Sequence, residues 1–409
     1  MLFRSPERAI SAVSATEVLE ALNAVDEAVA EGFHVAGYLA YEAGYALEPT
    51  LSGLLSDCGD EPLLWMGCYR EPLIAEFRRP AWNASQPAVS GTIQTSLSLT
   101  LEDYGRKLQR IRELIAAGDT YQANLTMDTI LQTNESPLAL YERLLRAQPV
   151  SYAAILHPSR DWHVLSLSPE LFLAGEGRRI RTKPMKGTAP RGADLDEDRD
   201  NAAWLAADEK NRSENLMIVD LLRSDLGRLC EMGSIQVTNL FEVERFPSVL
   251  QMTSTVEGVL PDGISYSSIF QALFPSGSIV GAPKINTMRL LHGFEGRPRG
   301  VYTGAIGSIA PDSRAEFNVA IRTVSLRGQT ARMGVGSGIV YDSEPVSEYE
   351  ECRTKTLFLR DESEGRFGIF EPCCSSRVHM LSYKSISNEW LHRRNTLLYP
   401  SIGRERSNV

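Results

Sequence analysis

The sequence has few of the features that mark a secreted, membrane-spanning or zinc-binding protein. Its six cysteines are spread over 409 residues, and no two have the C-x-x-C spacing, so we predict neither a zinc site nor a disulfide framework. No apolar run approaches the ~18–20 residues that cross a bilayer. Glu7 interrupts the apolar stretch within residues 1–14, which therefore do not resemble a signal peptide. We expect a cytoplasmic protein without a membrane partner.

An excess of basic residues is also lacking. The formal net charge is −10, whereas a general nucleic-acid-binding protein is basic, so we expect no nucleic-acid partner. No internal repeat of roughly 20–50 residues is present, which argues against a solenoid. The hydrophobic fraction of 43% and the charged fraction of 23% are those of a globular protein.

Three regions differ in their sequence patterns. Residues 1–98 alternate helix-like and strand-like stretches and end in a connecting segment rich in Pro, Ser and Thr. Residues 99–361 carry longer helical and β-rich patterns and form the predicted core. Residues 362–409 contain adjacent Cys373-Cys374 but no sustained period, so we expect this tail to lie outside the core.

Helix signals and strand signals both occur in the core region. Cap residues predict helix starts at Thr100, Ser136 and Asp208, and a last helix is predicted from 345 to about 359. The longest helix is predicted over 208–229, with one face formed by Leu216, Val219 and Leu222. Strands are predicted at 151–156, 164–167, 171–174, 178–182, 301–309, 316–326 and 331–341. Because helices and strands do not alternate regularly, we predict an α+β fold: a large mixed core with antiparallel sheets flanked by helices.

Several polar and glycine-rich segments are not explained by packing. Taken singly, each has an ordinary interpretation: Glu170 could cap or pair, and Lys186-Gly-Thr188 could be a surface turn. The 277–284 loop leads into a helix and could hold an anion, but it lacks the Walker and dinucleotide spacings. Glu351 could simply pair with Lys355 one helical turn later.

Together, these segments resemble the chorismate-utilising enzymes, which include anthranilate synthase component I, aminodeoxychorismate synthase component I, isochorismate synthase and salicylate synthase. The resemblance extends over roughly residues 100–360. The segments that carry it are Gly118-Asp-Thr-Tyr-Gln-Ala-Asn124, Ser168-Pro-Glu170, Lys186-Gly-Thr188, Asn215 to Arg228, Gly281-Ala-Pro-Lys284, Arg299-Gly300 with Tyr302 and Gly304, Ile321-Arg-Thr323, and Gly336-Ser-Gly338 through Asp342-Ser343 to Glu351.

The resemblance implies a Mg²⁺ cofactor and a site for the two carboxylates of chorismate. Glu214 and Glu351 match the family's metal ligands, with Glu348 beside them, and carboxylate oxygens are the ligands that Mg²⁺ prefers. The positions that match substrate-binding residues are Gly187, Thr188, Lys284, Tyr302, Gly304, Arg322, Gly336 and Gly338. Arg322 is expected to bind a carboxylate through two parallel hydrogen bonds.

One position separates members of this family. Anthranilate synthases carry Ala where this chain has Lys186, whereas aminodeoxychorismate synthases carry Lys. The resemblance therefore implies amination of chorismate at C4: Lys186 attacks C2, Glu170 protonates the departing C4 hydroxyl, and ammonia from a glutamine amidotransferase subunit displaces the lysine. We expect burial, or a cation such as Mg²⁺ or Lys284, to keep the lysine neutral.

The chain departs from the family pattern at three places. Gln251 replaces a frequent His that is tied to aromatisation in anthranilate synthases, Asn211 replaces a frequent Glu, and Val280 replaces a frequent Thr. Anthranilate synthase component I is the main alternative. A non-catalytic chorismate or tryptophan sensor is a second one, although such a protein would be expected to lose Glu170, Glu214 or Glu351. The tail resembles no known segment and is interpreted as a truncated remnant of a fused lyase domain.

Overall fold

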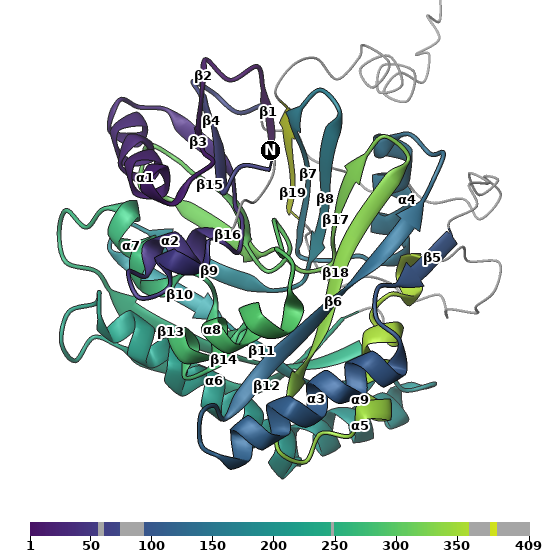
Figure 1. Cartoon of the computed structure of the whole chain (residues 1–409). Helices are drawn as coiled ribbons and strands as arrows, with labels where there is room; N and C mark the ends of the chain where they lie inside the picture. Colours follow the sequence, from purple (N-terminus) through teal and green to yellow (C-terminus); the bar gives the residue numbers. More distant parts are fainter. Residues whose placement is uncertain (56–60, 74–93, 247–248, 360–376, 383–409) are drawn as a thin grey trace, which may run out of the picture.

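The computed structural model describes residues 1–55, 61–73, 94–246, 249–359 and 377–382, and these residues form two large sheets with helices around them (Figure 1). The nine-stranded sheet has the order β1 (Leu2–Arg4), β19 (Arg377–Ser382), β7 (Tyr152–Ser159), β8 (Trp162–Ser168), β17 (Thr323–Arg327), β18 (Thr330–Ile339), β6 (Gln122–Gln132) and β14 (Gly281–Ala282), with β5 (Gln94–Leu97) also paired to β6. The ten-stranded sheet has the order β11 (Met185–Pro190), β13 (Val249–Val259), β10 (Arg179–Lys183), β9 (Leu171–Glu176), β16 (Ala315–Val319), β15 (Ala305–Ile309), β3 (His34–Leu39), β4 (Leu64–Tyr69) and β2 (Arg8–Ala12), with β12 (Gln236–Arg245) also paired to β13.

Helices cover the outer faces of the sheets. They are α1 (Ala15–Ala30), α2 (Ala43–Leu47), α3 (Leu101–Ala116), α4 (Pro137–Ala147), α5 (Leu195–Ala207), α6 (Glu209–Gly227), α7 (Tyr266–Leu273), α8 (Lys284–Glu295) and α9 (Pro345–Thr354), with the 3₁₀ turns η1 (Ser52–Leu54), η2 (Gly277–Ile279) and η3 (Leu357–Leu359). Every strand pair is antiparallel except those that β19 makes with β1 and β7. The predicted α+β class with antiparallel sheets is therefore confirmed.

The predicted helix starts are confirmed by their cap contacts. The side chains of Thr100, Ser136 and Asp208 accept hydrogen bonds from backbone N–H groups in the first turns of α3, α4 and α6. Of the three residues predicted to share one face of α6, Val219 and Leu222 are buried, whereas Leu216 is 44% exposed. The polar side chain of Asn215 is buried on the inner face of α6 and accepts a hydrogen bond from Ser254 Oγ at 2.6 Å. The pattern of apolar residues alone therefore did not identify the inner face of this helix.

The predicted strand over 316–326 is two strands in different sheets. β16 lies in the ten-stranded sheet and β17 in the nine-stranded sheet, and the chain crosses between them at Arg322, whose φ of 50° is uncommon for a residue other than glycine. The strand predicted over 301–309 starts only at Ala305. Residues 300–304 form turns before it. Both differences place turn residues between the two sheets.

The predicted division near residue 98 does not separate two sheets. β3, from the N-terminal region, pairs with β15 of the core region, and β1 belongs to the nine-stranded sheet. β19 lies between β1 and β7, so residues 377–382 of the tail pair with a strand of the core region. The rest of the tail falls outside the described residues. Such pairings between distant segments are not visible in local sequence patterns.

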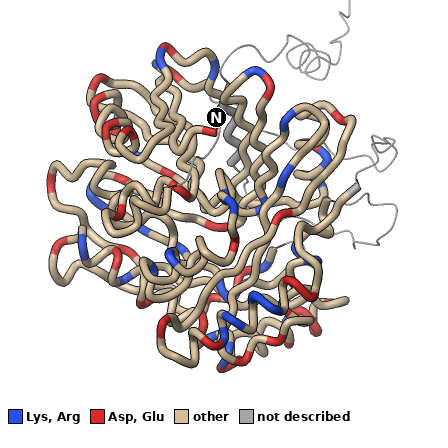
Figure 2. The backbone as a smooth tube through the Cα atoms, viewed as in Figure 1, with Lys and Arg blue, Asp and Glu red and all other residues tan. Residues whose placement is uncertain are grey.

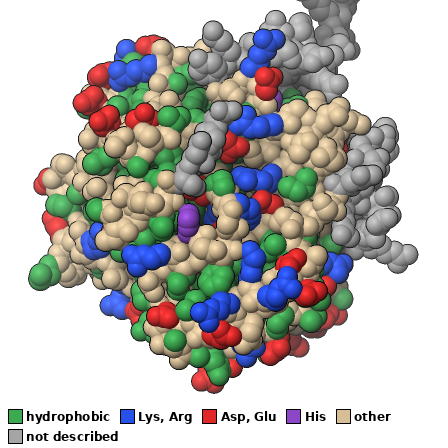
Figure 3. Space-filling model, in the orientation of Figure 1, with side chains coloured by type: hydrophobic (Ala, Val, Ile, Leu, Met, Phe, Trp, Pro, Cys, Tyr) green, Lys and Arg blue, Asp and Glu red, His purple; other side chains and the backbone are tan. Residues whose placement is uncertain are grey.

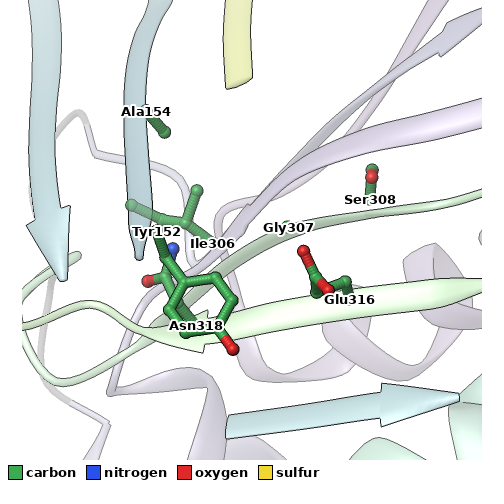
Figure 4. Close-up of a pocket in the computed structure, with 7 residues that line it drawn as sticks. All are labelled: Tyr152, Ala154, Ile306, Gly307, Ser308, Glu316 and Asn318. Carbon is green, nitrogen blue, oxygen red and sulfur yellow. The ribbon is translucent and has the colours of Figure 1, made fainter. Parts of the chain in front are cut away.

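The sheets pack against each other through large buried side chains. Tyr38 of β3 and Trp162 of β8 meet edge to face, with ring centroids 5.7 Å apart. A pocket also opens between the sheets (Figure 4), lined by Tyr152, Ala154, Ile306, Gly307, Ser308, Glu316 and Asn318. None of these seven residues belongs to the site predicted from the sequence.

Charged side chains occur both on the surface and inside the molecule. On the face shown in Figure 3, basic and acidic side chains are interspersed, and Figure 2 shows charged positions near the middle of the molecule as well as on the outer helices. In the described part of the chain, no helix is both long and apolar enough to cross a membrane.

The most connected buried charge is Arg299. Its Nε and Nη2 atoms donate to the two carboxylate oxygens of Glu295, each at 2.8 Å. Nη2 also donates to Asn124 O of β6, and Nη1 donates to Ile279 O of η2. Glu42, from the N-terminal region, accepts from the backbone N–H groups of Arg299 and Gly300. One guanidinium therefore joins α8, a strand and a loop.

We expect Arg299→Met to lower the free energy of unfolding by about 3–5 kcal/mol, because it leaves Glu295 buried without its cation. The matched control is Arg314→Met, which breaks an exposed ion pair with Asp312 and is expected to cost under about 1 kcal/mol. Urea unfolding of both variants measures the difference. Equal losses would contradict the central role of Arg299.

Candidate active site

Lys186 lies in an irregular part of β11, the edge strand of the ten-stranded sheet. Met185 pairs with Thr253 and Thr188 pairs with Gln251, so the register shifts between these two pairs. Such bulges turn side chains away from the regular alternation of a strand. Gly187 has a φ of +86°, which favours glycine. The bulge therefore gives Lys186 a direction that a regular strand would not.

The Lys186 side chain reaches β18 of the other sheet. A Cβ atom added to Gly338 would lie 3.2 Å from Lys186 Nζ, so the missing side chain at Gly338 leaves room for the amine. Burial lowers the pKa of Lys186, and the nearby cation of Lys355 lowers it further, while Glu214, Glu170 and Glu351 act in the opposite direction. Burial is the largest of these effects, so the net shift of the Lys186 pKa is downward.

Glu170 supplies a carboxyl group near this amine. It is 5% exposed, and its Oε1 accepts from Ser278 Oγ of η2 at 2.5 Å. Burial raises the pKa of Glu170 to about 7, although the Ser278 hydrogen bond and the charge of Lys186 lower it in part. A carboxyl group with this pKa can give and take a proton near neutral pH.

Lys284 has a different environment from the one expected. Its ammonium donates to Asp225 Oδ2 at 2.6 Å and to the carbonyl oxygens of Leu273 and Pro275 at 3.2 and 3.4 Å. An ammonium has three donors, and all three have protein acceptors here. Lys284 therefore ties the start of α8 to α6, and the cation that lowers the pKa of Lys186 is Lys355 rather than Lys284.

The three glutamates expected to hold Mg²⁺ come from α6 and α9. Burial raises the pKa of Glu214, and the charges of Glu351 and Glu348 raise it further, so the three carboxylates face one region. Glu351 binds Lys355 Nζ at 2.7 Å, and Glu348 accepts from Ser343 Oγ at 2.8 Å. Among the described residues, no three acidic, His or Cys side chains form a ready-made metal cluster. Carboxylate oxygens are suitable ligands for Mg²⁺, but one oxygen of Glu351 is paired with Lys355 in this structure.

The remaining candidates for substrate binding differ in whether their polar groups already have protein partners. No residue in the described part of the chain hydrogen-bonds to the Arg322 guanidinium, and burial lowers its pKa to about 10. The carbonyl of Gly336 accepts from Lys355 Nζ at 2.8 Å. The ring of Tyr302 packs against Gly334, and Gly304 packs against the backbone of Leu39. Arg322 is therefore the candidate best placed to accept a new anion.

The remaining two candidates, Gly187 and Thr188, hydrogen-bond to Gln251. Gln251 Nε2 donates to Gly187 O at 2.8 Å, and Thr188 Oγ1 donates to Gln251 Oε1 at 3.0 Å. The structure thus brings Glu170, Glu214 and Glu351 within electrostatic reach of Lys186. Lys284 forms an ion pair with Asp225, and Gly304 packs against the backbone of Leu39.

Sequence reasoning missed four residues of this site: Lys355, Ser278, Gln122 and Gln251 as a contact residue. The sequence already indicated the pair of Lys355 with Glu351, but not the effect of Lys355 on the pKa of Lys186. Gln122 belongs to a segment that carries the family resemblance; it is 1% exposed, its Oε1 has no hydrogen-bond partner among the described residues, and its amide borders Gly338. No local signal indicated Ser278 or the partners of Gln251.

The family model described as "chorismate binding enzyme" matches residues 4–361, which is most of the chain. The chain belongs to the chorismate binding enzyme family. It is 43% identical over 258 residues to an aminodeoxychorismate synthase from Streptomyces pristinaespiralis, which covers 63% of this chain and 36% of the relative. It is 38% identical over 287 residues to anthranilate synthase component 1 from Streptomyces coelicolor, which covers 70% of this chain and 56% of the relative.

A solved structure agrees with this assignment. The crystal structure of anthranilate synthase component I from Streptococcus pneumoniae superposes with a TM-score of 0.72 and 27% identity, and covers 83% of this chain and 85% of that one. The chain spans about half or less of the length of the curated relatives it matches. The predicted family and fold are confirmed, while relatives with two different activities are similarly close in sequence.

We expect Lys284→Met to lower the free energy of unfolding by about 3–5 kcal/mol, because Asp225 would remain buried without its cation. Lys284→Met combined with Asp225→Leu should regain most of that loss, since no buried charge is left unpaired. Urea unfolding measures stability, and calorimetry under folding conditions measures chorismate affinity. Loss of affinity with unchanged stability would instead make Lys284 a substrate-binding residue.

Proposed function

We propose that this chain is a transferase that aminates chorismate at C4 to give 4-amino-4-deoxychorismate, through a covalent intermediate on Lys186. One observation carries the proposal: an amine whose pKa is lowered lies within electrostatic reach of a buried carboxyl group whose pKa is about 7. Both pKa shifts are in the direction that the reaction needs, which is toward a neutral nucleophile and a protonated general acid.

The bonds of the proposed reaction balance without an oxidant or reductant. The Lys186 amine forms a bond to C2 of the ring, the double bonds shift, and the C4–O bond breaks. Glu170 gives its proton to the departing hydroxyl, which leaves as water, and the nitrogen of Lys186 loses a proton. Ammonia then forms a bond to C4 and gives up a proton, the double bonds shift back, and the C2–N bond breaks as the Lys186 nitrogen takes a proton and becomes the free amine again.

The charged side chains would hold the two carboxylates of chorismate. Glu214, Glu348 and Glu351 would bind Mg²⁺, which when bound supplies a hard cation for one substrate carboxylate. Arg322 would bind the other carboxylate, because its guanidinium can form two parallel hydrogen bonds. Lys355 would leave Glu351 when the metal takes that oxygen.

The proposal includes a source of ammonia and a use for the product. We propose that a separate glutamine amidotransferase subunit supplies ammonia, and that ammonium alone supports the reaction in its absence. The product keeps its enolpyruvyl group, so a lyase must act on it before 4-aminobenzoate is available for folate biosynthesis.

Anthranilate synthase component I is the second candidate, because a relative with that name is 38% identical over 287 residues. Lys186 and Gln251 favour the first candidate, since the anthranilate enzymes resemble one another in carrying Ala and His there. Incubation with chorismate, Mg²⁺ and ammonium distinguishes the two candidates. Anthranilate fluoresces, whereas the amino product of the first reaction does not.

We expect Lys186 to form an adduct with chorismate when ammonia is absent. Mass spectrometry of the intact protein would detect the added mass, and peptide mapping would locate it at Lys186. Lys186→Ala should remove the adduct and most of the amination yet keep chorismate binding, because Arg322 and the three glutamates are unchanged. A Lys186→Ala protein that aminates chorismate at the normal rate would show that ammonia attacks the ring directly.

We expect the rate of adduct formation to fall as the pH rises through about 7. Glu170 has a raised pKa, so it is protonated below about pH 7 and loses the proton that the leaving hydroxyl needs above it. Glu170→Gln should lower the rate by about 10²–10⁴-fold and remove this limb of the pH profile. A profile that is unchanged in Glu170→Gln would assign the proton to another group.

A further inference from the structure

The irregular segment of β11 depends on one side chain from the neighbouring strand β13. A bulge leaves backbone groups without a partner in the strand ladder, and a partly buried carbonyl such as that of Gly187 is less stable when it has no hydrogen bond. Gln251 Nε2 donates to Gly187 O at 2.8 Å. Its Oε1 accepts from Thr188 Oγ1 at 3.0 Å. One carboxamide therefore binds the two residues that follow Lys186.

A second close neighbour of the same turn comes from α6. A Cβ atom on Gly187 would lie 3.0 Å from the Cβ and Oδ1 atoms of Asn211. Asn211 is itself held, because its backbone N–H and Nδ2 both donate to Asp208 Oδ2 at 2.8 Å. The turn thus lies next to both Gln251 and Asn211, two of the three positions where the chain departs from the family pattern.

We infer that Gln251 is a positioning residue that fixes the direction of the Lys186 side chain by holding the β11 bulge. This inference rests on the proposed function for its consequence, namely that Lys186 is the nucleophile. The bulge lies in an edge strand, which pairs with β13 on one side only, so the strand ladder alone holds it weakly. The carboxamide replaces the missing ladder contacts.

The contact with Gly187 and Thr188 requires a side chain that carries both a hydrogen-bond donor and an acceptor. The backbone oxygen of Gly187 can only accept, so it needs the NH₂ group, and the Thr188 hydroxyl then donates to the carbonyl oxygen. Glutamate has the same shape but no donor, and it would place an anion against Gly187 O. The two nitrogens of a histidine ring lie on different edges of the ring, whereas a carboxamide presents both groups from one carbon.

The first test compares Gln251→Glu with the control Gln109→Glu, which makes the same change at an exposed position of α3. With chorismate, Mg²⁺ and ammonium, we expect Gln251→Glu to lower kcat by about 10²-fold, since a misplacement of ~1 Å has that cost. KM for chorismate should stay within about twofold, because Arg322 and the glutamates are unchanged. Gln109→Glu should match the wild type.

The second test removes the other half of the contact. Thr188→Val should lower kcat by about tenfold through loss of one hydrogen bond, and Thr188→Ser, which keeps the hydroxyl, should regain most of that rate. In the same samples, an amine-acylating reagent followed by peptide mapping measures the labelling rate of Lys186 without any need for amination. We expect this rate to change at least about threefold in Gln251→Glu and Thr188→Val, and the urea midpoint to stay near that of the wild type.

The outcomes separate the inference from the proposed function. A wild-type chain that does not aminate chorismate overturns the proposed function, while the labelling rates still test the position of Lys186. Wild-type kcat and wild-type labelling in both Gln251→Glu and Thr188→Val overturn the inference. A fall in kcat that tracks a lower urea midpoint, with unchanged labelling of folded protein, also overturns it.

Discussion

The buried ion pair between Arg299 and Glu295 is the interaction on which the rest of the structure depends. Removing either charge from water costs several kcal/mol, and the pair offsets this only because its remaining donors are also satisfied. The guanidinium binds Asn124 O of β6 and Ile279 O of η2, and Glu42 binds the backbone next to it. Segments far apart in the sequence are therefore fixed around a single side chain.

The Arg299 side chain also helps to position Glu170 in the candidate active site. Ile279 is held by Arg299, and its neighbour Ser278 donates to Glu170. The hydrogen bond and the charge of Lys186 favour the carboxylate, but burial outweighs both, so the pKa rises to about 7. Burial also outweighs the nearby acids at Lys186 and lowers its pKa. The same desolvation thus moves the acid and the amine in opposite directions, each toward the form that the proposed reaction uses.

Local features of the sequence predicted the local structure well. Cap residues such as Thr100 located helix starts, because a cap contacts only the next turn. Patterns failed where a distant partner decides the outcome. Leu216 is exposed, whereas its neighbour Asn215 is buried and hydrogen-bonds to Ser254. The strand predicted over 316–326 is two strands because the chain crosses between the sheets at Arg322. The partners of Lys284 were not visible in the sequence either, because its acceptors come from residues 225, 273 and 275, and no spacing in the sequence brings these together.

The departures from the family pattern gain a meaning that the sequence alone could not give them. Gln251 and Asn211 were noticed as a missing His and a missing Glu, which suggested only that some chemistry is absent. In the fold they are neutral amides that both lie next to Gly187, in the turn that carries Lys186. A histidine ring or a carboxylate at either position would place a pH-dependent charge beside the Lys186 amine, which the proposed reaction needs in its neutral form. A carboxylate there would raise the pKa of Lys186. Two of the three positions where this chain departs from the family pattern therefore carry neutral side chains beside the turn of Lys186, which is the nucleophile of the proposed reaction.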